Sequence, residues 1–216
     1  APCRTLRQDH REDHMTPLKL IGLALVASLA LSTAAFAQDI TIAVAGPMTG
    51  GESAFGRQLK NGAEQAVADL NDAGGVLGKK LRLFVGDDAC DPKQARSVAE
   101  KIASQGIPFV AGHYCSSSSI PASEAYADGN VLEITPATTN PLFTERNLWN
   151  VARVCGRDDQ QGQVSAEYIL KNYQGKNVAI LNDKTTYGKG LADETKKVLN
   201  KAGFQEKMFE SYNKGD

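Results

Sequence analysis

Short runs of aliphatic and β-branched residues alternate with longer segments of helical period along most of this chain. This alternation is typical of βαβ units, in which a helix connects two parallel strands of one sheet. It therefore predicts an α/β fold. The predicted strands are 40–45, 81–85, 109–111, 131–134, 148–151, 178–181 and 205–209; the predicted helices are 57–73, 91–106, 119–127, 160–172 and one that ends at 201.

Local signals fix the ends of some of these helices. Asp91 followed by Pro92 predicts a helix start, with the aspartate as N-cap and the proline in the first helical position. Gly74 and Gly75 stop the first helix, since glycine readily adopts the conformation that ends a helix. That first helix should bury one apolar face, formed by Leu59, Ala63, Ala66, Val67 and Leu70.

The first 37 residues have the pattern of segments that precede a folded protein. After Met15 and Lys19, an apolar stretch over 20–31 leads to a small-residue tail that ends at Ala37. This order predicts a secretory signal peptide over 15–37, and hence a soluble, exported product. The apolar stretch is shorter than the roughly 20 residues that a membrane-spanning helix needs. Residues 1–14 are interpreted as an upstream or added segment.

A polar run around Gly156 interrupts the α/β pattern. We expect residues 38–157 to form an N-terminal ligand-binding lobe, and residues 158–216 to form the first part of a second lobe that is truncated here. The formal net charge is −1. Without a basic cluster, the chain offers little to neutralise phosphates, so a nucleic acid is not an expected partner. A small and nearly neutral ligand is favoured instead.

Two loops of the predicted sheet carry small polar residues where parallel sheets usually bind ligands, beyond the carboxyl ends of the strands. The loop 113–119 leads into a helix, and its hydroxyls and free backbone N–H groups suit a carboxylate. A serine-rich helix cap without a ligand would look the same. The loop 135–141 offers carbonyl and hydroxyl oxygens, which suit an ammonium group, unless it is an ordinary proline-rich connection. Together the loops favour a zwitterion.

Two other groups of residues could carry chemistry. Asp87 and Asp88 could hold a metal or accept a phosphoryl group, but structural capping is favoured, because receiver domains carry such a pair after the first strand. Ser116, His113 and an aspartate could form a hydrolase triad, but the chain lacks a G-x-S-x-G turn around Ser116. We therefore predict no catalytic residue, no metal site and no cofactor.

Cys90 and Cys115 follow successive predicted strands, so they lie side by side if those strands are neighbours. Export would permit a disulfide between them. A zinc or redox pair is the alternative, but the chain lacks the C-x-x-C spacing and a second pair of ligands. Cys155 is left over, as a buried thiol or as the partner of a cysteine outside this sequence.

Four blocks of this sequence closely resemble the leucine/isoleucine/valine-binding proteins of Gram-negative bacteria. The resemblance covers almost all of 38–216, with the blocks in the same order. It implies a type I periplasmic-binding-protein fold, with two parallel-sheet α/β lobes that close on an amino acid about a hinge. The blocks are Asp87-Asp88-Ala89-Cys90-Asp91-Pro92-Lys93-Gln94-Ala95, Gly112-His113-Tyr114-Cys115-Ser116-Ser117-Ser118, Thr135-Pro136-Ala137-Thr138-Thr139 and Asp183-Lys184-Thr185-Thr186-Tyr187-Gly188.

The resemblance also implies a role for particular residues. Ser116 and the backbone beside it would hold the α-carboxylate, while the carbonyl of Ala137 and the hydroxyl of Thr139 would hold the ammonium group. Tyr187 would close over the ligand from the second lobe. Phe55 stands where relatives often have tyrosine and would pack against the ligand's side chain. The family's disulfide corresponds to Cys90 and Cys115, and its acidic partner for the ammonium group lies beyond Asp216.

The function that the resemblance implies is transport rather than catalysis. The expected protein is a periplasmic substrate-binding protein that captures leucine, isoleucine, valine or a similar aliphatic amino acid. It would deliver this ligand to the membrane permease subunits of an ABC importer. The alternative is an extracellular amino-acid sensor domain of the same fold, which would require a transmembrane helix and a signalling module after Asp216.

Overall fold

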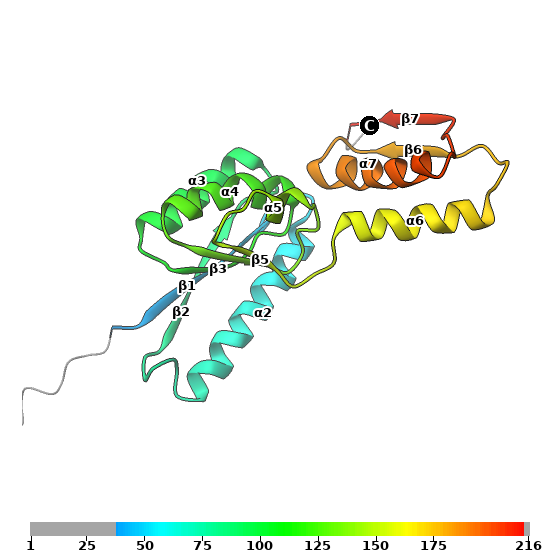
Figure 1. Ribbon diagram of the computed structural model, residues 1–216. Helices are drawn as coiled ribbons and strands as arrows, with labels where there is room; N and C mark the ends of the chain where they lie inside the picture. The colour runs from blue at the N-terminus through cyan, green and yellow to red at the C-terminus, as the bar shows by residue number, and fades with distance from the viewer. Residues whose placement is uncertain (1–37, 214–216) are drawn as a thin grey trace, which may run out of the picture. The chain divides into compact units, whose positions relative to one another are not determined.

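The computed structural model describes residues 38–213, which form two parallel sheets with helices beside them (Figure 1). The predicted upstream segment and signal peptide lie outside the described residues. The elements in chain order are β1 (Ile40–Gly46), α2 (Ser53–Asp72), β2 (Leu81–Asp87), α3 (Pro92–Ser104), β3 (Phe109–Gly112), α4 (Ser116–Asp128), β4 (Leu132–Thr135), α5 (Leu142–Glu145), β5 (Val151–Arg153), α6 (Asp158–Asn172), β6 (Ala179–Asn182), α7 (Thr186–Lys201) and β7 (Met208–Ser211).

The larger sheet has five parallel strands in the order β2-β1-β3-β4-β5. Its register places Val44 of β1 between Val85 of β2 and Ala111 of β3. The chain moves from β1 to β2 in one direction and then to β3 in the other, so right-handed crossovers place the connecting helices on opposite faces. Accordingly, α2 covers one face, and α3 and α4 pack together on the other (Figure 1). The direction changes between β1 and β3, which is where such sheets bind ligands.

The main core lies between this sheet and the helices α3 and α4. Ala95, Ala99 and Ile102 recur at helical spacing on α3, and all three are fully buried. Tyr126 of α4 is also fully buried. The remaining buried members are Ala43, Ala45, Ile107, Val110, Ala122, Ala125 and Val131.

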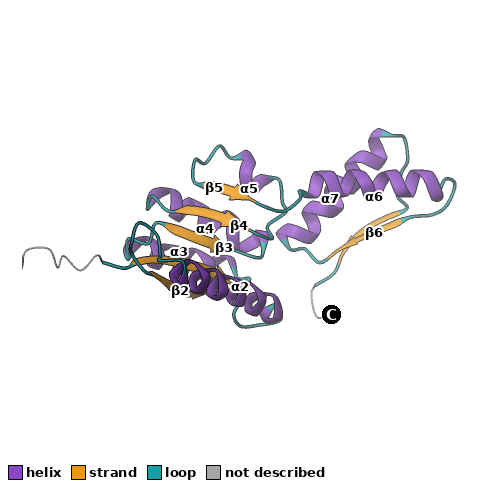
Figure 2. Cartoon of the chain, turned by 90° about the horizontal axis from the view of Figure 1, so that it is seen from below, coloured by secondary structure: helices purple, strands orange, loops and turns teal. Residues whose placement is uncertain are grey.

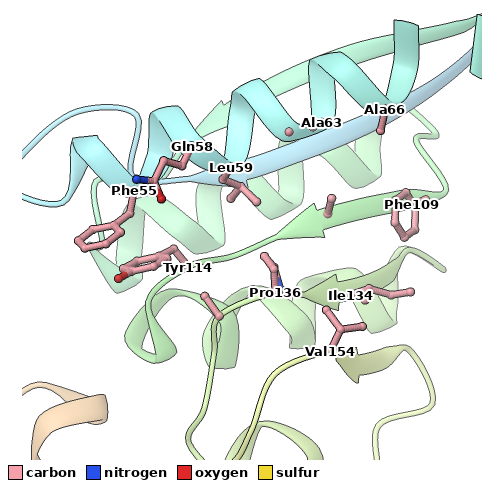
Figure 3. A pocket seen from close by; sticks show the side chains of 13 residues that line it. Phe55, Gln58, Leu59, Ala63, Ala66, Phe109, Tyr114, Ile134, Pro136 and Val154 are labelled. Carbon is pink, nitrogen blue, oxygen red and sulfur yellow. The ribbon is translucent and has the colours of Figure 1, made fainter. Parts of the chain in front are cut away.

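The face of the sheet beside α2 is more open, and the prediction of a buried α2 face is partly wrong. Leu59, Ala63 and Val67 are half-buried, but Ala66 is exposed and Leu70 is 44% exposed. The reason is an apolar groove of about 530 Å³ between α2 and the strands β3 and β4 (Figure 3). No element among residues 38–213 covers this groove, so the residues of α2 that face it stay partly exposed.

The second sheet pairs β6 and β7 in parallel, with Ala179 opposite Met208. Helices α6 and α7 pack together beside it (Figure 2). Its separate small core consists of Ala166, Ile180, Ala192 and Leu199. The boundary at 157/158 between two lobes stays a prediction.

The start of α3 was predicted correctly from local signals, whereas the position of β5 depends on contacts between residues distant in sequence. Asp91 caps α3, with its Oδ1 accepting a hydrogen bond from the Gln94 N–H at 2.8 Å. The fifth strand is Val151–Arg153 rather than 148–151. Apolar Trp149 suggested a strand, but it is 63% exposed. The register is set instead by Asn150, whose amide donates to the carbonyls of Ser123 and Val131.

Three further boundaries differ from the prediction. Helix α4 begins at Ser116 rather than 119, because Cys115 is extended and accepts the first N–H bonds of the helix. A short helix, α5, lies in a segment predicted as a loop. The last strand begins at Met208 rather than 205, where the pairing with β6 begins. Among the described residues, no helix combines the length and apolarity needed to cross a membrane.

Candidate functional site

The loops after β3 and β4 meet at the carboxyl end of the larger sheet and line a crevice of about 220 Å³. Its lining consists of Tyr114, Cys115, Ser116, Ala137, Thr139 and Tyr187. Four of the five predicted ligand-binding residues, namely all except Phe55, therefore lie together. A second hollow of about 480 Å³ adjoins it and shares Tyr114, Cys115, Ser116 and Tyr187.

The N-terminus of α4 forms the hydrogen-bond donor side of this crevice. Ser116 is the first helical residue and is 2% exposed. The N–H groups of Ser118 and Ser119 already donate to the Cys115 carbonyl. Among the described residues, no acceptor takes the N–H of Ser116 or Ser117, or the hydroxyl hydrogen of Ser116. These donors, with the positive end of the helix dipole, are suited to a carboxylate.

The loop after β4 forms the acceptor side and is fastened to the loop after β3. The Thr135 hydroxyl donates to the His113 carbonyl at 2.6 Å. The same oxygen accepts the N–H groups of Ala137, at 3.2 Å, and Thr138, at 3.0 Å. Because one threonine binds both loops, the donor and acceptor sides of the crevice hold a fixed spacing.

Two aromatic rings form an apolar wall at the end of the crevice. Phe55 stacks on Tyr114, with ring centroids 4.7 Å apart and an angle of 12° between the planes (Figure 3). Tyr114 lines both the crevice and the apolar groove, while Phe55 lines the groove. The structure thus places Phe55 beside the crevice rather than in its lining, and Tyr114 lies between the two.

A glycine allows Phe55 to take this position. Gly56 is the only buried residue of α2, and a Cβ there would lie 2.0 Å from the Pro47 carbonyl oxygen. No larger residue fits this close approach between the loop after β1 and the first turn of α2. The loop therefore packs tightly against the helix start and fixes the backbone at Phe55.

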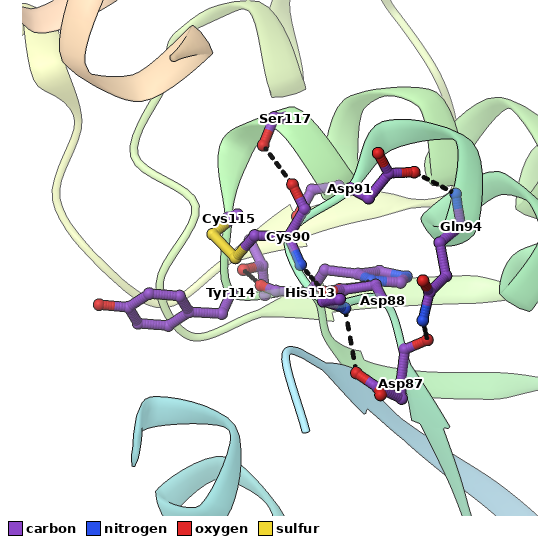
Figure 4. Close-up of polar contacts among 12 residues, drawn as sticks. Asp87, Asp88, Cys90, Asp91, Gln94, His113, Tyr114, Cys115 and Ser117 are labelled. Atoms are coloured by element: carbon purple, nitrogen blue, oxygen red, sulfur yellow. Dashed lines mark hydrogen bonds and ion pairs between the residues drawn. A yellow bond between two sulfur atoms is a disulfide. The ribbon is translucent and has the colours of Figure 1, made fainter. Parts of the chain in front are cut away.

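Cys90 and Cys115 form a disulfide that joins the loops after β2 and β3, with Cα atoms 5.6 Å apart (Figure 4). This confirms the predicted pairing. Cys115 immediately precedes Ser116, so the cross-link anchors the donor side of the crevice. Cys155 is a free, half-buried thiol that donates to the Thr138 carbonyl at 3.4 Å.

The aspartates after β2 cap and connect loops, as predicted. Asp87 Oδ1 accepts the N–H groups of Met48 and Thr49, and Oδ2 accepts the Thr49 hydroxyl at 2.6 Å. These bonds hold the pKa of the Asp87 carboxyl below its ordinary value, although burial opposes them. Asp87 thereby ties the loop after β1 to the end of β2. Asp88 Oδ1 accepts the Cys90 N–H at 2.8 Å.

A buried polar network lies beneath the disulfide. His113 is fully buried, and its Nδ1 lies 2.5 Å from Asp88 Oδ2 (Figure 4). Its Nε2 lies 3.0 Å from the Tyr126 hydroxyl. Both ring nitrogens are therefore occupied within this network. This arrangement contradicts a triad in which His113 serves as a base for Ser116. Burial raises the pKa of both Tyr126 and Glu133. Glu133 Oε1 accepts the backbone N–H of His113 at 3.2 Å.

Two residues of the site, Tyr114 and Arg153, were not predicted from the sequence. Tyr114 stands between Gly112 and the disulfide cysteine Cys115, in the loop after β3, and this position was the signal that could have indicated its role. Arg153 donates to carbonyls of the loop after β4. An arginine in a strand next to that loop could have suggested such a role, but its direction depends on the strand register.

A model of the periplasmic binding protein family matches residues 39–215. The chain belongs to the periplasmic binding protein family. This family consists of solute-binding proteins, in agreement with the prediction that the chain is not an enzyme. The parallel α/β architecture is that of the type I periplasmic binding proteins.

This periplasmic binding protein is similar to named relatives over most of its sequence. It is 52% identical over 195 residues to "Leu/Ile/Val-binding protein homolog 2" of Brucella abortus, covering 90% of this chain and 52% of the relative. A leucine-binding protein from Thermotoga maritima is 31% identical, with a TM-score of 0.73 over 82% of this chain and 50% of that chain. A substrate-binding protein of an ABC transporter from Desulfitobacterium hafniense, solved with leucine, is 28% identical, with a TM-score of 0.63 over 82% and 52%. The chain thus spans about half the length of these proteins.

Proposed function

We propose that this protein is the periplasmic substrate-binding component of an ABC importer for a branched-chain or other small aliphatic amino acid. The observation that carries the proposal is the crevice with unpaired donors at Ser116 on one side and acceptors at Ala137 and Thr139 on the other. An α-amino acid has the matching groups, a carboxylate and an ammonium group on one carbon. The relatives' names agree with this ligand class.

The remaining parts of the proposal concern location and delivery. The signal-peptide pattern over 15–37 supports export to the periplasm. Delivery to permease subunits is supported by the likeness to a substrate-binding protein of an ABC transporter.

Tyr187, at the start of α7, lines the crevice and is 43% exposed. We propose that it covers the ligand when the protein closes.

Selectivity for an aliphatic side chain is assigned to the Phe55–Tyr114 wall, because carboxylate and ammonium contacts are common to all α-amino acids. In the complete protein, we expect calorimetry to show leucine and valine binding more tightly than alanine, and serine binding weakest. Phe55→Ala should weaken leucine binding by roughly 1 to 2 kcal/mol, since apolar contact is lost. Alanine binding should change by less than about 0.5 kcal/mol, because a methyl group does not reach the wall.

Trp149→Ala provides the control, since Trp149 is an exposed aromatic residue outside the crevice. This variant should bind every amino acid as the wild type does. Absence of binding by any aliphatic amino acid would refute the proposed function. Equal losses for leucine and alanine in Phe55→Ala would refute only the role of the aromatic wall.

A further inference from the structure

Arg153 stabilises the loop after β4, which is proposed to hold the ammonium group, by donating hydrogen bonds to it. The guanidinium donates to the Thr138 carbonyl at 2.7 Å, to the Asn140 carbonyl at 3.0 Å and to the Thr144 hydroxyl at 2.8 Å. A planar guanidinium can bridge carbonyls in this way, whereas a lysine ammonium cannot match its geometry. Two carbonyls of the loop are thus occupied by protein donors.

Asp158, the first residue of α6, holds the carbonyl between those two. Its N–H donates to the Thr139 carbonyl at 3.0 Å. Among the described residues, no donor is directed at the carbonyl of Ala137. The carbonyls of residues 138–140 therefore accept hydrogen bonds from the protein, whereas the Ala137 carbonyl, which belongs to a residue of the crevice lining, has no donor among residues 38–213 and is available to a ligand.

The Asp158 carboxylate and the Thr139 hydroxyl oxygen are both buried without a hydrogen-bond partner among residues 38–213. Asp158 is 0% exposed, and neither of its carboxylate oxygens has a hydrogen bond of normal geometry within residues 38–213. The same holds for Thr139 Oγ1. An unpaired buried carboxylate is costly, so its presence requires a function or a partner.

The Thr139 hydroxyl stabilises the charged form of this carboxylate. Burial raises the pKa of the Asp158 carboxyl above its ordinary value, and the Thr139 hydroxyl and Arg153 oppose that rise by favouring the charged form. The backbone bond between the two residues keeps their side chains adjacent. The Thr139 hydroxyl is thus within the electrostatic reach of the Asp158 carboxylate.

We infer that Asp158 is a positioning residue for the ammonium site, which it serves by accepting the hydroxyl hydrogen of Thr139. A threonine hydroxyl has one hydrogen to donate and two lone pairs that accept. When the hydrogen is directed to Asp158, the lone pairs are left for the ligand's N–H groups. The carboxylate thereby ensures that Thr139 meets the ammonium group as an acceptor. The inference rests on the proposed amino-acid site.

A double-mutant cycle on the complete protein tests this role, with leucine affinity measured by calorimetry. Asp158→Asn presents an amide that can donate to Thr139 Oγ1 and so competes with the ligand. We expect it to weaken leucine binding roughly 5- to 30-fold, and Thr139→Val to weaken it roughly tenfold or more. The double variant should bind no more weakly than Thr139→Val, because Asp158 acts through the hydroxyl that this variant lacks.

Asp159→Asn is the matched control, since it makes the same chemical change one residue away. Asp159 pairs with Arg157, with 2.9 Å between Oδ2 and Nη2, and its side chain is 39% exposed. Its leucine affinity should stay within about twofold of the wild type. Thermal unfolding without ligand separates a loss of folding from a loss of affinity, and Asp158→Ala replaces Asp158→Asn if the latter does not fold.

The outcomes separate this inference from the proposed function. Wild-type affinity in Asp158→Asn, with weakened binding in Thr139→Val, would overturn the positioning role and leave the site intact. Losses that add in the double variant would also overturn it, since Asp158 would then act independently of Thr139. Unchanged binding in Thr139→Val, or no binding by the wild type, would instead refute the proposed site.

Discussion

Replacing Cys90 and Cys115 together by serine should lower the free energy of unfolding by about 3.5 kcal/mol. The two cysteines are 25 residues apart and their disulfide closes one loop of the chain. Without the cross-link the unfolded chain gains conformational entropy, which is the main source of the loss on the chain-entropy model. Leucine affinity should fall as well, because Cys115 immediately precedes Ser116 and the cross-link anchors it. Urea unfolding of the complete protein under oxidising conditions measures the change.

Two comparisons make the disulfide experiment specific. A thiol reductant should shift the wild-type transition to that of the Cys90→Ser/Cys115→Ser variant, and should leave the variant unchanged. Cys155→Ser controls for the loss of a thiol, since Cys155 forms no disulfide within residues 38–213. Coincident unfolding midpoints for wild type and double variant would show that the cross-link contributes nothing to stability.

Ser116→Ala should weaken leucine binding by roughly 1.5 to 3 kcal/mol, the range for a hydrogen bond to a charged group. The hydroxyl lies in the crevice at the N-terminus of α4, beside two unpaired backbone N–H groups. Folding stability should change little, because the Ser116 hydroxyl donates to no acceptor among the described residues. Calorimetry with leucine gives the affinity, and thermal unfolding without ligand gives the stability.

Ser117→Ala is the matched control for Ser116→Ala. The Ser117 hydroxyl donates to the Cys90 carbonyl at 3.4 Å, so its removal takes a long bond within the protein and none from the proposed ligand. We expect this variant to bind leucine within about twofold of the wild type. If both variants keep full affinity, Ser116 does not contact the carboxylate.

Local chemistry made much of the fold predictable from the sequence. Asp91 and Pro92 determine the start of α3 within a single turn, so no distant contact was needed to place it. Asn150 shows the opposite case. Its amide binds carbonyls 27 and 19 residues away, and those bonds place β5 where the apolar Trp149 does not predict it. Strand boundaries that depend on such distant pairs are not encoded locally.

In the candidate site, too, some residues could be placed from the sequence and others could not. Ser116 and Thr139 follow strands that meet at one edge of a parallel sheet, so their proximity follows from the strand pattern. The stacking of Phe55 on Tyr114 depends on how the loop after β1 folds against α2, and the sequence alone does not specify this. Asp158 is equally hidden, since a charged residue at a helix start is usually a solvated cap, whereas here it is fully buried.

The central claim is that the crevice recognises both charged ends of an α-amino acid. Calorimetry of the complete protein with leucine, 4-methylpentanoate and 3-methylbutylamine tests it most directly, because the two analogues each lack one charged group. We expect leucine to bind at least about a hundredfold more tightly than either analogue, since each loses charge-assisted hydrogen bonds. An analogue that binds as tightly as leucine would contradict the account, because the group it lacks would then have no role in the site.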